Sequence, residues 1–101
     1  MAEFIHPNLA DVPLTAALHA LSDPARLAMV RNLAGAGELN CECALPSCAA
    51  PKSTRSNHLK VLRAAGLIET RREGRELFSR LRKKEFEARF PGLLRAVLKA
   101  E

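Results

Sequence analysis

The sequence predicts a mainly helical single domain that carries one small β-hairpin. Apolar residues recur every three or four positions over most of the chain, whereas residues 67–81 alternate with a period of two. The 48% of apolar residues include no Trp or Tyr and only four Phe, so the core is built mainly from Leu, Ala and Val. At 101 residues such a core is modest, and burying further apolar surface against a second copy would help. We therefore expect a homodimer.

Two helices are expected in the first third of the chain. Residues 1–12 form an N-terminal arm of mixed composition, and Pro13 suits the first position of a helix, which needs no N–H donor. A second helix begins near Pro24, with Ser22 or Asp23 as its N-terminal cap, and ends at the glycines of "GAG". The apolar stripes are Leu14, Ala17, Leu18 and Leu21 in the first helix, and Leu27, Val30, Leu33 and Ala34 in the second.

The middle of the chain predicts a short or distorted helix followed by a well-marked one. Pro46 would remove a hydrogen bond from any continuous helix after Leu39. The helix from Lys52 has a polar N-terminal half, and its C-terminal half has Leu59, Leu62 and Ala65 on one inward face. Gly66 ends this helix.

The last third predicts a β-hairpin and a final helical segment. "REGR" interrupts the alternating residues and places Gly74 at the tip of the hairpin. Residues 83–100 have helical spacing, with a kink or restart at Pro91. Helix, helix, short helix, helix, hairpin, helix is the order of a winged helix-turn-helix domain of residues 1–101.

Positive charge is concentrated in one stretch. The chain has 16 Lys and Arg against 11 Asp and Glu, a net charge of +5. Residues 52–84 hold eleven of the basic side chains and three acidic ones, which makes this stretch +8 and the remainder −3. Nucleic acid is the commonest polyanionic partner of such a face, although a solvated charged surface is an open alternative. In the predicted fold, the helix from Lys52 enters a major groove by its N-terminal end, and the hairpin arginines lie over adjacent backbone or minor groove.

Three segments carry a family resemblance. "ALSDPARLAMVRNLAGAGEL", "KSTRSNHLKVLRAAGLIETRREGR" and "LFSRL" resemble the ArsR/SmtB family of bacterial winged-helix repressors, most closely from Leu18 to Leu81. The resemblance implies a sequence-specific transcriptional repressor of double-stranded DNA. It also implies a homodimer that binds an inverted repeat in an operator and leaves it when an inducer binds.

The resemblance also assigns roles to residues. The residues that it assigns to DNA binding offer hydroxyls, an amide and a helix N-terminus, which suit contacts to phosphates and base edges. His58 has the alternative of contacting the neighbouring helix. The expected DNA-binding residues are Lys52, Ser53, Thr54, Arg55, Ser56, Asn57, His58 and Lys60 of the helix, with Arg71, Arg72 and Arg75 of the hairpin. The dimerisation helices are residues 13–21 and 83–100, with Leu14, Ala17, Leu18, Leu21, Phe86, Phe90, Leu94 and Val97 at the interface.

"CECALPSC" holds all three cysteines, Cys41, Cys43 and Cys48. Metal-sensing members of the family carry a Cys-x-Cys pair before the recognition helix, where As(III) or another thiophilic metal ion binds three thiolates. An ungapped comparison places Asn40 and Glu42 at those positions, a shift of one residue or about 100° around a helix. Two interpretations stay open, a thiophilic or sulfur-sensing inducer site and small apolar residues in the core.

Other chemistry has less support. Structural zinc would need His58 as its fourth ligand, and the family's Asp/His metal site on the last helix is missing because no His follows His58. Persulfide sensors of the family pair distant cysteines, whereas these are clustered. No enzyme is expected, since "GAGELN" lacks the third glycine of a dinucleotide loop and "HALSD" forms no nucleophile elbow. The competing class is a thiol-based metal-binding or carrier domain that does not bind DNA.

The N-terminal residues also bear on the compartment. Met1 to Leu14 is interrupted by charged residues and prolines, so neither a secretion signal nor a membrane span is expected. An odd number of cysteines without an export signal indicates reduced thiols rather than a disulfide framework. We therefore expect a cytoplasmic protein with no membrane partner.

Overall fold

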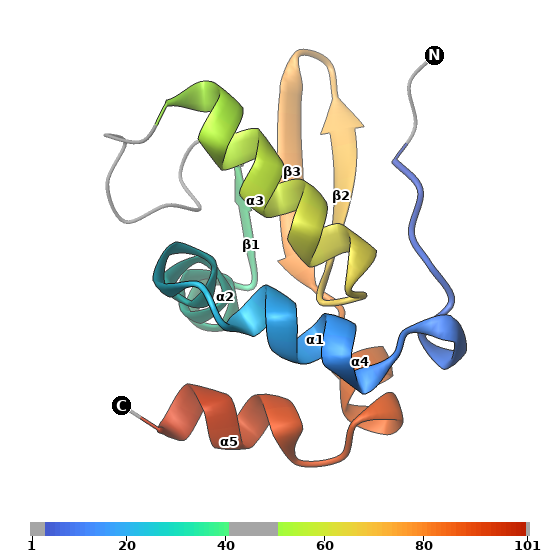
Figure 1. The fold of residues 1–101 in the computed structure, drawn as a ribbon. Coiled ribbons are helices and arrows are strands. Elements are labelled where there is room, and N and C mark those ends of the chain that lie inside the picture. The colour runs from blue at the N-terminus through green and yellow to red at the C-terminus, as the bar shows by residue number, and fades with distance from the viewer. Residues whose placement is uncertain (1–3, 41–50, 101) are drawn as a thin grey trace.

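The structure is a computed structural model that describes residues 4–40 and 51–100. Helices lie below a small antiparallel sheet and across one face of it, where α3 crosses in front of the β2–β3 hairpin (Figure 1). The elements in chain order are the 3-10 helix η1 (Leu9–Asp11), α1 (Leu14–Leu21), α2 (Pro24–Ala36), β1 (Glu38–Asn40), α3 (Lys52–Ala64), β2 (Ile68–Glu73), β3 (Glu76–Leu81), α4 (Lys83–Arg89) and α5 (Leu93–Lys99). The short helix predicted around Pro46 falls outside the described residues.

Helix α2 begins as its sequence predicts. The side chain of Asp23 accepts hydrogen bonds from the backbone N–H groups of Ala25 at 2.9 Å and Arg26 at 3.2 Å. These bonds stabilise the carboxylate and lower the pKa of Asp23, with the bond from Arg26 as the largest cause. Pro24 occupies the first turn, and Gly37 follows the helix with a φ of +86°. The predicted cap and start of this helix are confirmed, and its end lies at Ala36.

The sheet has one strand more than expected. The predicted hairpin is confirmed, with Gly74 at a φ of +62° in the turn that joins Glu73 to Glu76. A third strand, β1, pairs antiparallel with the other edge of β3, so the strand order is β1-β3-β2. Three residues are too few to show an alternating pattern, and this strand depends on the free edge of β3.

The final helical segment is two helices rather than one. Helix α4 ends at Arg89 and α5 begins at Leu93, with Gly92 between them at a φ of +80°. This confirms the predicted restart at Pro91. The rings of Phe86 and Phe90 lie 5.1 Å apart in the core.

The core takes up most of the expected dimer residues. Ala17, Leu21, Phe86, Phe90 and Leu94 are buried inside one chain and leave little surface for a second copy, while the dimer interface itself stays a prediction. They are the inward side of the same helical stripes, because a stripe on a short helix is first covered by its own chain. Val97 is half-buried, whereas Leu14 and Leu18 on α1 are 49% and 46% exposed. Of the eight expected interface residues, only these three keep apolar surface for a partner.

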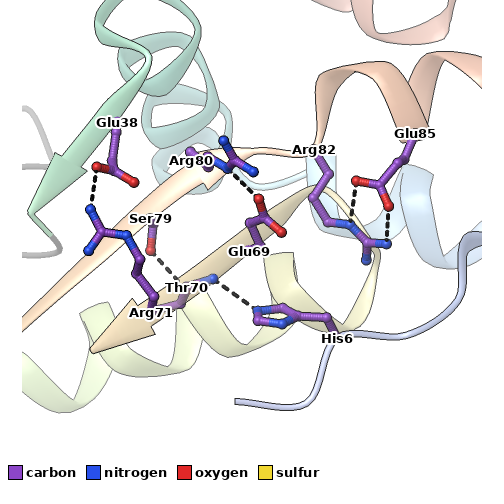
Figure 2. Close-up of polar contacts among 9 residues, drawn as sticks. All are labelled: His6, Glu38, Glu69, Thr70, Arg71, Ser79, Arg80, Arg82 and Glu85. Carbon is purple, nitrogen blue, oxygen red and sulfur yellow. Dashed lines mark hydrogen bonds and ion pairs between the residues drawn. The ribbon is translucent and has the colours of Figure 1, made fainter. Parts of the chain in front are cut away.

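The N-terminal arm packs on the body of the domain. Leu9 and Val12 are buried, and the guanidinium of Arg89 donates to both of their carbonyl oxygens at 3.0 Å. The N–H of Thr70 in β2 donates to Nε2 of His6 at 2.9 Å (Figure 2). The arm therefore covers part of the free edge of β2, which reduces the exposure of unpaired strand groups. In the described part of the chain, no helix is long and apolar enough to cross a membrane.

Candidate nucleic-acid interface

The N-terminal half of α3 is exposed, as a DNA-reading helix requires. Pro51 precedes the helix, and no side chain among the described residues caps its first N–H groups. Free N–H groups at a helix N-terminus can donate to phosphate oxygens. The exposed predicted residues on this helix are Lys52, Ser53, Thr54, Ser56, Asn57 and Lys60, whereas Arg55 is half-buried.

The β2–β3 hairpin, residues 68–81, is here called the wing. Its tip lies at the same end of the molecule as the start of α3 (Figure 1). Both elements line one groove, with Lys52, Arg55 and Ser56 contributed by α3. The wing contributes Arg75, Glu76 and Leu77. The structure therefore brings the predicted helix tip and the end of the hairpin together.

The strand register separates the wing arginines. Thr70 pairs with Ser79, and their hydroxyls lie 2.9 Å apart on the face toward α3, where Nη1 of Arg63 approaches Thr70 Oγ1 at 3.3 Å. Because side chains alternate along a strand, Arg72 lies on this same face and Arg71 on the opposite one. The two neighbouring arginines thus point to different sides of the sheet.

Arg71 is neutralised on the outer face of the sheet. Its Nη2 lies 2.8 Å from Glu38 Oε1 in β1, and its Nη1 pairs with Glu73 (Figure 2 shows the pair with Glu38). Its guanidinium also stacks 4.9 Å over the ring of Phe78. Arg72 and Arg75, by contrast, are exposed and form no ion pair within the part of the chain that the structure describes. Of the three arginines expected to contact DNA, Arg71 is therefore already paired within the protein, whereas Arg72 and Arg75 have no ion pair with the described residues.

A second ion pair lies beside Arg71 on the outer face. Arg80 pairs with Glu69, and the hydrogen bond from that pair raises the pKa of Arg80 (Figure 2). Arg82, farther along the chain, is buried, donates to the carbonyl oxygen of Pro7 at 2.8 Å and pairs with Glu85 at 2.9 Å. The hydrogen bond from Arg82 lowers the pKa of Glu85. These basic residues hold the sheet and the arm together and are not free for DNA.

His58 faces inward. Its side chain is 14% exposed, with Nδ1 3.3 Å from Arg26 Nη1 and Nε2 3.9 Å from Asp23 Oδ2. Both partners belong to the start of α2. The alternative expectation for this residue, a contact with the neighbouring helix, is what the structure contains.

Comparisons with known proteins agree with this geometry. A family model described as a helix-turn-helix domain matches residues 21–71, which span α2, α3 and the start of the wing. The uncharacterized HTH-type transcriptional regulator YceK of Bacillus subtilis is 43% identical over 76 residues, covering 74% of this chain and 76% of YceK. Solved structures include the transcriptional repressor BigR from Xylella fastidiosa, with 32% identity, a TM-score of 0.61 and coverage of 75% and 78% of the two chains. An ArsR family transcriptional regulator has 25% identity, a TM-score of 0.67 and coverage of 74% and 81%.

The chain belongs to the ArsR-like winged helix-turn-helix transcriptional regulators. Both the predicted family and the predicted fold are confirmed. As an ArsR-like regulator it is a DNA-binding protein that acts in transcription regulation and not an enzyme, as its sequence motifs predicted.

The metal prediction has a separate outcome in this ArsR-like regulator. Cys41, Cys43 and Cys48 lie outside the described residues. Among residues 4–40 and 51–100, no three His, Cys, Asp or Glu side chains are grouped as metal ligands. The sensory and the structural interpretations of the cysteines therefore both remain predictions.

Proposed function

We propose that this regulator is a homodimeric repressor that binds an inverted repeat in duplex DNA and leaves it when an inducer binds. The observation that carries the proposal is the shared groove of the α3 N-terminus and the wing, lined by Lys52, Arg55, Ser56 and Arg75. Such a groove lets one helix reach base edges while the wing contacts the flanking backbone. BigR, which has a similar fold, is itself a transcriptional repressor.

The homodimer is supported by the exposed face of α1. Leu14 and Leu18 are four residues apart and therefore neighbours on one side of the helix, and each is about half exposed. A second copy would remove this apolar surface from water. A two-fold dimer would present its two recognition helices, one α3 from each copy, in opposite orientations, as an inverted repeat requires. A separation of about 34 Å, one turn of duplex DNA, would let both helices enter the major groove on one side of the duplex.

The DNA proposal is tested by selecting bound sequences from a random duplex library and titrating the best one by fluorescence anisotropy at several salt concentrations. Phosphate contacts release counterions, so log K should fall linearly with log of the salt concentration. An inverted repeat among the selected sequences is expected. No sequence enrichment together with no salt dependence would overturn the proposal, and metal uptake without DNA binding would favour the carrier domain.

Two matched substitutions test the geometry. Arg72→Ala should weaken binding to all duplexes and reduce the salt slope by about 1.8, because each of the two protomers loses one phosphate contact worth about 0.9. Arg71→Ala removes the same charge from the opposite face of the wing and should have a smaller effect, because Glu38 and Glu73 already neutralise it. Equal losses in the two variants would contradict the assigned faces of the wing.

As inducer we propose a thiophilic ion such as As(III) acting at Cys41, Cys43 and Cys48. The support is chemical: three thiols within eight residues can surround a soft ion. DNA-bound protein is titrated with As(III), Sb(III), Cd(II), persulfide and peroxide, and the series is repeated with all three cysteines replaced by serine. Release that disappears in the serine variant is expected. Release that persists in it, or no release by any agent, would make the cysteines structural.

A further inference from the structure

Three helices meet around the guanidinium of Arg26, the third residue of α2. Arg26 is only 8% exposed. Its Nε donates to the carbonyl oxygen of Ala20 at 2.8 Å, and its Nη2 donates to that of His19 at 3.1 Å. Both carbonyls belong to the last turn of α1, where the helix dipole is negative and backbone oxygens depend on partners beyond the helix. The carbonyl oxygen of His19 also accepts from the N–H and the hydroxyl of Ser22. Arg26 therefore caps the C-terminus of α1.

The third nitrogen of this guanidinium contacts α3, the proposed recognition helix. Arg26 Nη1 lies 3.3 Å from His58 Nδ1, and because a guanidinium only donates, Nδ1 must be the acceptor. The ring proton then sits on Nε2, which faces Asp23 Oδ2 at 3.9 Å. Asp23 is itself held by the N–H groups at the start of α2. Both edges of the imidazole thus face fixed partners, and the ring has one orientation.

We propose that His58 is a positioning residue for DNA reading. Its bond to Arg26 fixes the rotation of α3 about its own axis, and so the place where Ser56 and Asn57 meet the base edges. Leu59 and Leu62 also hold α3 on the core, but apolar contacts have no preferred direction, whereas a hydrogen bond does. This inference rests on the proposed repressor function.

The same bond connects α3 to the helix that carries the proposed dimer face. Arg26 holds the end of α1, and α1 bears the exposed Leu14 and Leu18. A fixed relation between α1 and α3 becomes, in a two-fold dimer, a fixed separation of the two recognition helices. His58 should therefore also sharpen the preference for one spacing between half-sites.

A small rotation is enough to matter. Side-chain ends lie about 5 Å from a helix axis, so turning α3 by about 10° moves them by about 1 Å. That shift exceeds the spread of good hydrogen-bond lengths, and breaking one base-edge hydrogen bond lowers affinity by about tenfold. Long, flexible side chains such as Lys52 can follow a shift of about 1 Å and keep their phosphate contacts. Loss of His58 should therefore reduce specific binding and spare non-specific binding.

The test compares three substitutions at position 58 in the full chain. His58→Leu removes both ring nitrogens. His58→Asn keeps an acceptor near the place of Nδ1, within reach of Arg26, whereas His58→Gln carries its amide toward the place of Nε2 and Asp23. Each variant is titrated with the selected operator, with operators whose half-site spacing is one base pair longer or shorter, and with unrelated duplex. Thermal unfolding and circular dichroism report the folded fraction.

For His58→Leu we expect an affinity for the operator at least about tenfold lower, with affinity for unrelated duplex within about twofold of wild type and a weaker spacing preference. His58→Asn should stay within about threefold of wild type, and His58→Gln should resemble His58→Leu. Equal losses of affinity for the operator and for unrelated duplex would show that His58 has a purely structural role. Wild-type affinity in His58→Gln would show that the hydrogen bond to Arg26 is not needed for DNA reading. Failure of the wild-type chain to prefer any sequence would instead refute the proposed function.

Discussion

Replacing Gly66 with alanine should destabilise the domain far more than the same change at the wing tip. Gly66 has a φ of +76° and ends α3, with its N–H donating to the carbonyl of Arg63 at 3.0 Å and that of Leu67 donating to the carbonyl of Leu62 at 3.1 Å. This pair of bonds is the Schellman arrangement that favours glycine after a helix. A Cβ at this position would lie 1.8 Å from Leu9 Cδ2, in the packed arm.

Two costs add at this position. An L-residue in the left-handed region costs about 1–2 kcal/mol. Because Leu9 is buried, its side chain has little room to move, and overpacking of this kind typically costs about 1–3 kcal/mol more. The sum is about 2–5 kcal/mol, and at about 4 °C or more per kcal/mol for a domain of this size the melting temperature should fall by at least about 8 °C.

Gly74→Ala is the matched control. Gly74 has a φ of +62°, and nothing lies within 4 Å of the place that a Cβ would take, so only the conformational cost of about 1–2 kcal/mol applies. Both variants are unfolded by heat and by denaturant at one fixed protein concentration, because dimer formation would make stability depend on concentration. Leu9→Ala should then remove the clash, so that the double variant with Gly66→Ala is more stable than additivity predicts by about 1–3 kcal/mol. Equal losses in the two glycine variants, or strict additivity with Leu9→Ala, would refute the reasoning.

Further predictions concern the arm, the wing and α1. Burial lowers the pKa of His6 below its ordinary 6.5. The contribution of His6 to folding stability is therefore complete above pH 6.5 and is lost as pH falls through the lowered pKa. Protonated Nε2 can no longer accept the hydrogen bond from the N–H of Thr70. Denaturant unfolding over pH should show this loss in wild type and a flatter profile in His6→Gln, whose amide oxygen accepts without titrating; identical profiles would contradict it. Glu38→Gln removes one ion-pair partner of Arg71 and should raise the affinity for DNA at low salt by about two- to fivefold, measured by fluorescence anisotropy. No gain in affinity would mean that Glu38 does not affect DNA binding by the wing. Leu18→Glu should shift sedimentation toward the monomer, and an unchanged oligomeric state would place the dimer face elsewhere.

The elements that the sequence predicted well are those with a local physical signal. Asp23 and Pro24 mark the start of α2, because a cap must supply an acceptor and the first position needs no donor. Gly74 marks the wing tip and Pro91 the break between the last helices for similar local reasons. Strand β1 has no such signal, since its pairing with β3 arises only when the hairpin is already formed.

The roles of single side chains were harder to predict from the sequence. The alternating pattern of the wing shows that Arg71 and Arg72 point to opposite faces, but both faces carry charge, so the pattern does not say which face meets α3. The partner Glu38 is distant in sequence and comes into reach only through β1. In the same way, His58 looks like one more polar residue of a DNA-reading helix until Arg26 is placed against it.

The distribution of free cations leads to a final prediction about the salt slope. Residues 52–84 hold eleven basic side chains, and a dimer that used all of them on phosphates would give a slope near about −20. The structure removes several from that set, because they pair with acids or the arm. The exposed cations near α3 and the wing tip without an ion pair among the described residues are Lys52, Lys60, Arg72 and Arg75. At about 0.9 per contact, two copies of these four cations give a slope of about −7, and the half-buried Arg55 of the same groove would add at most about −2. A measured slope of about −4 to −7 would agree with this division of the charge, whereas one beyond about −12 would mean that the paired arginines exchange their carboxylates for phosphates on binding.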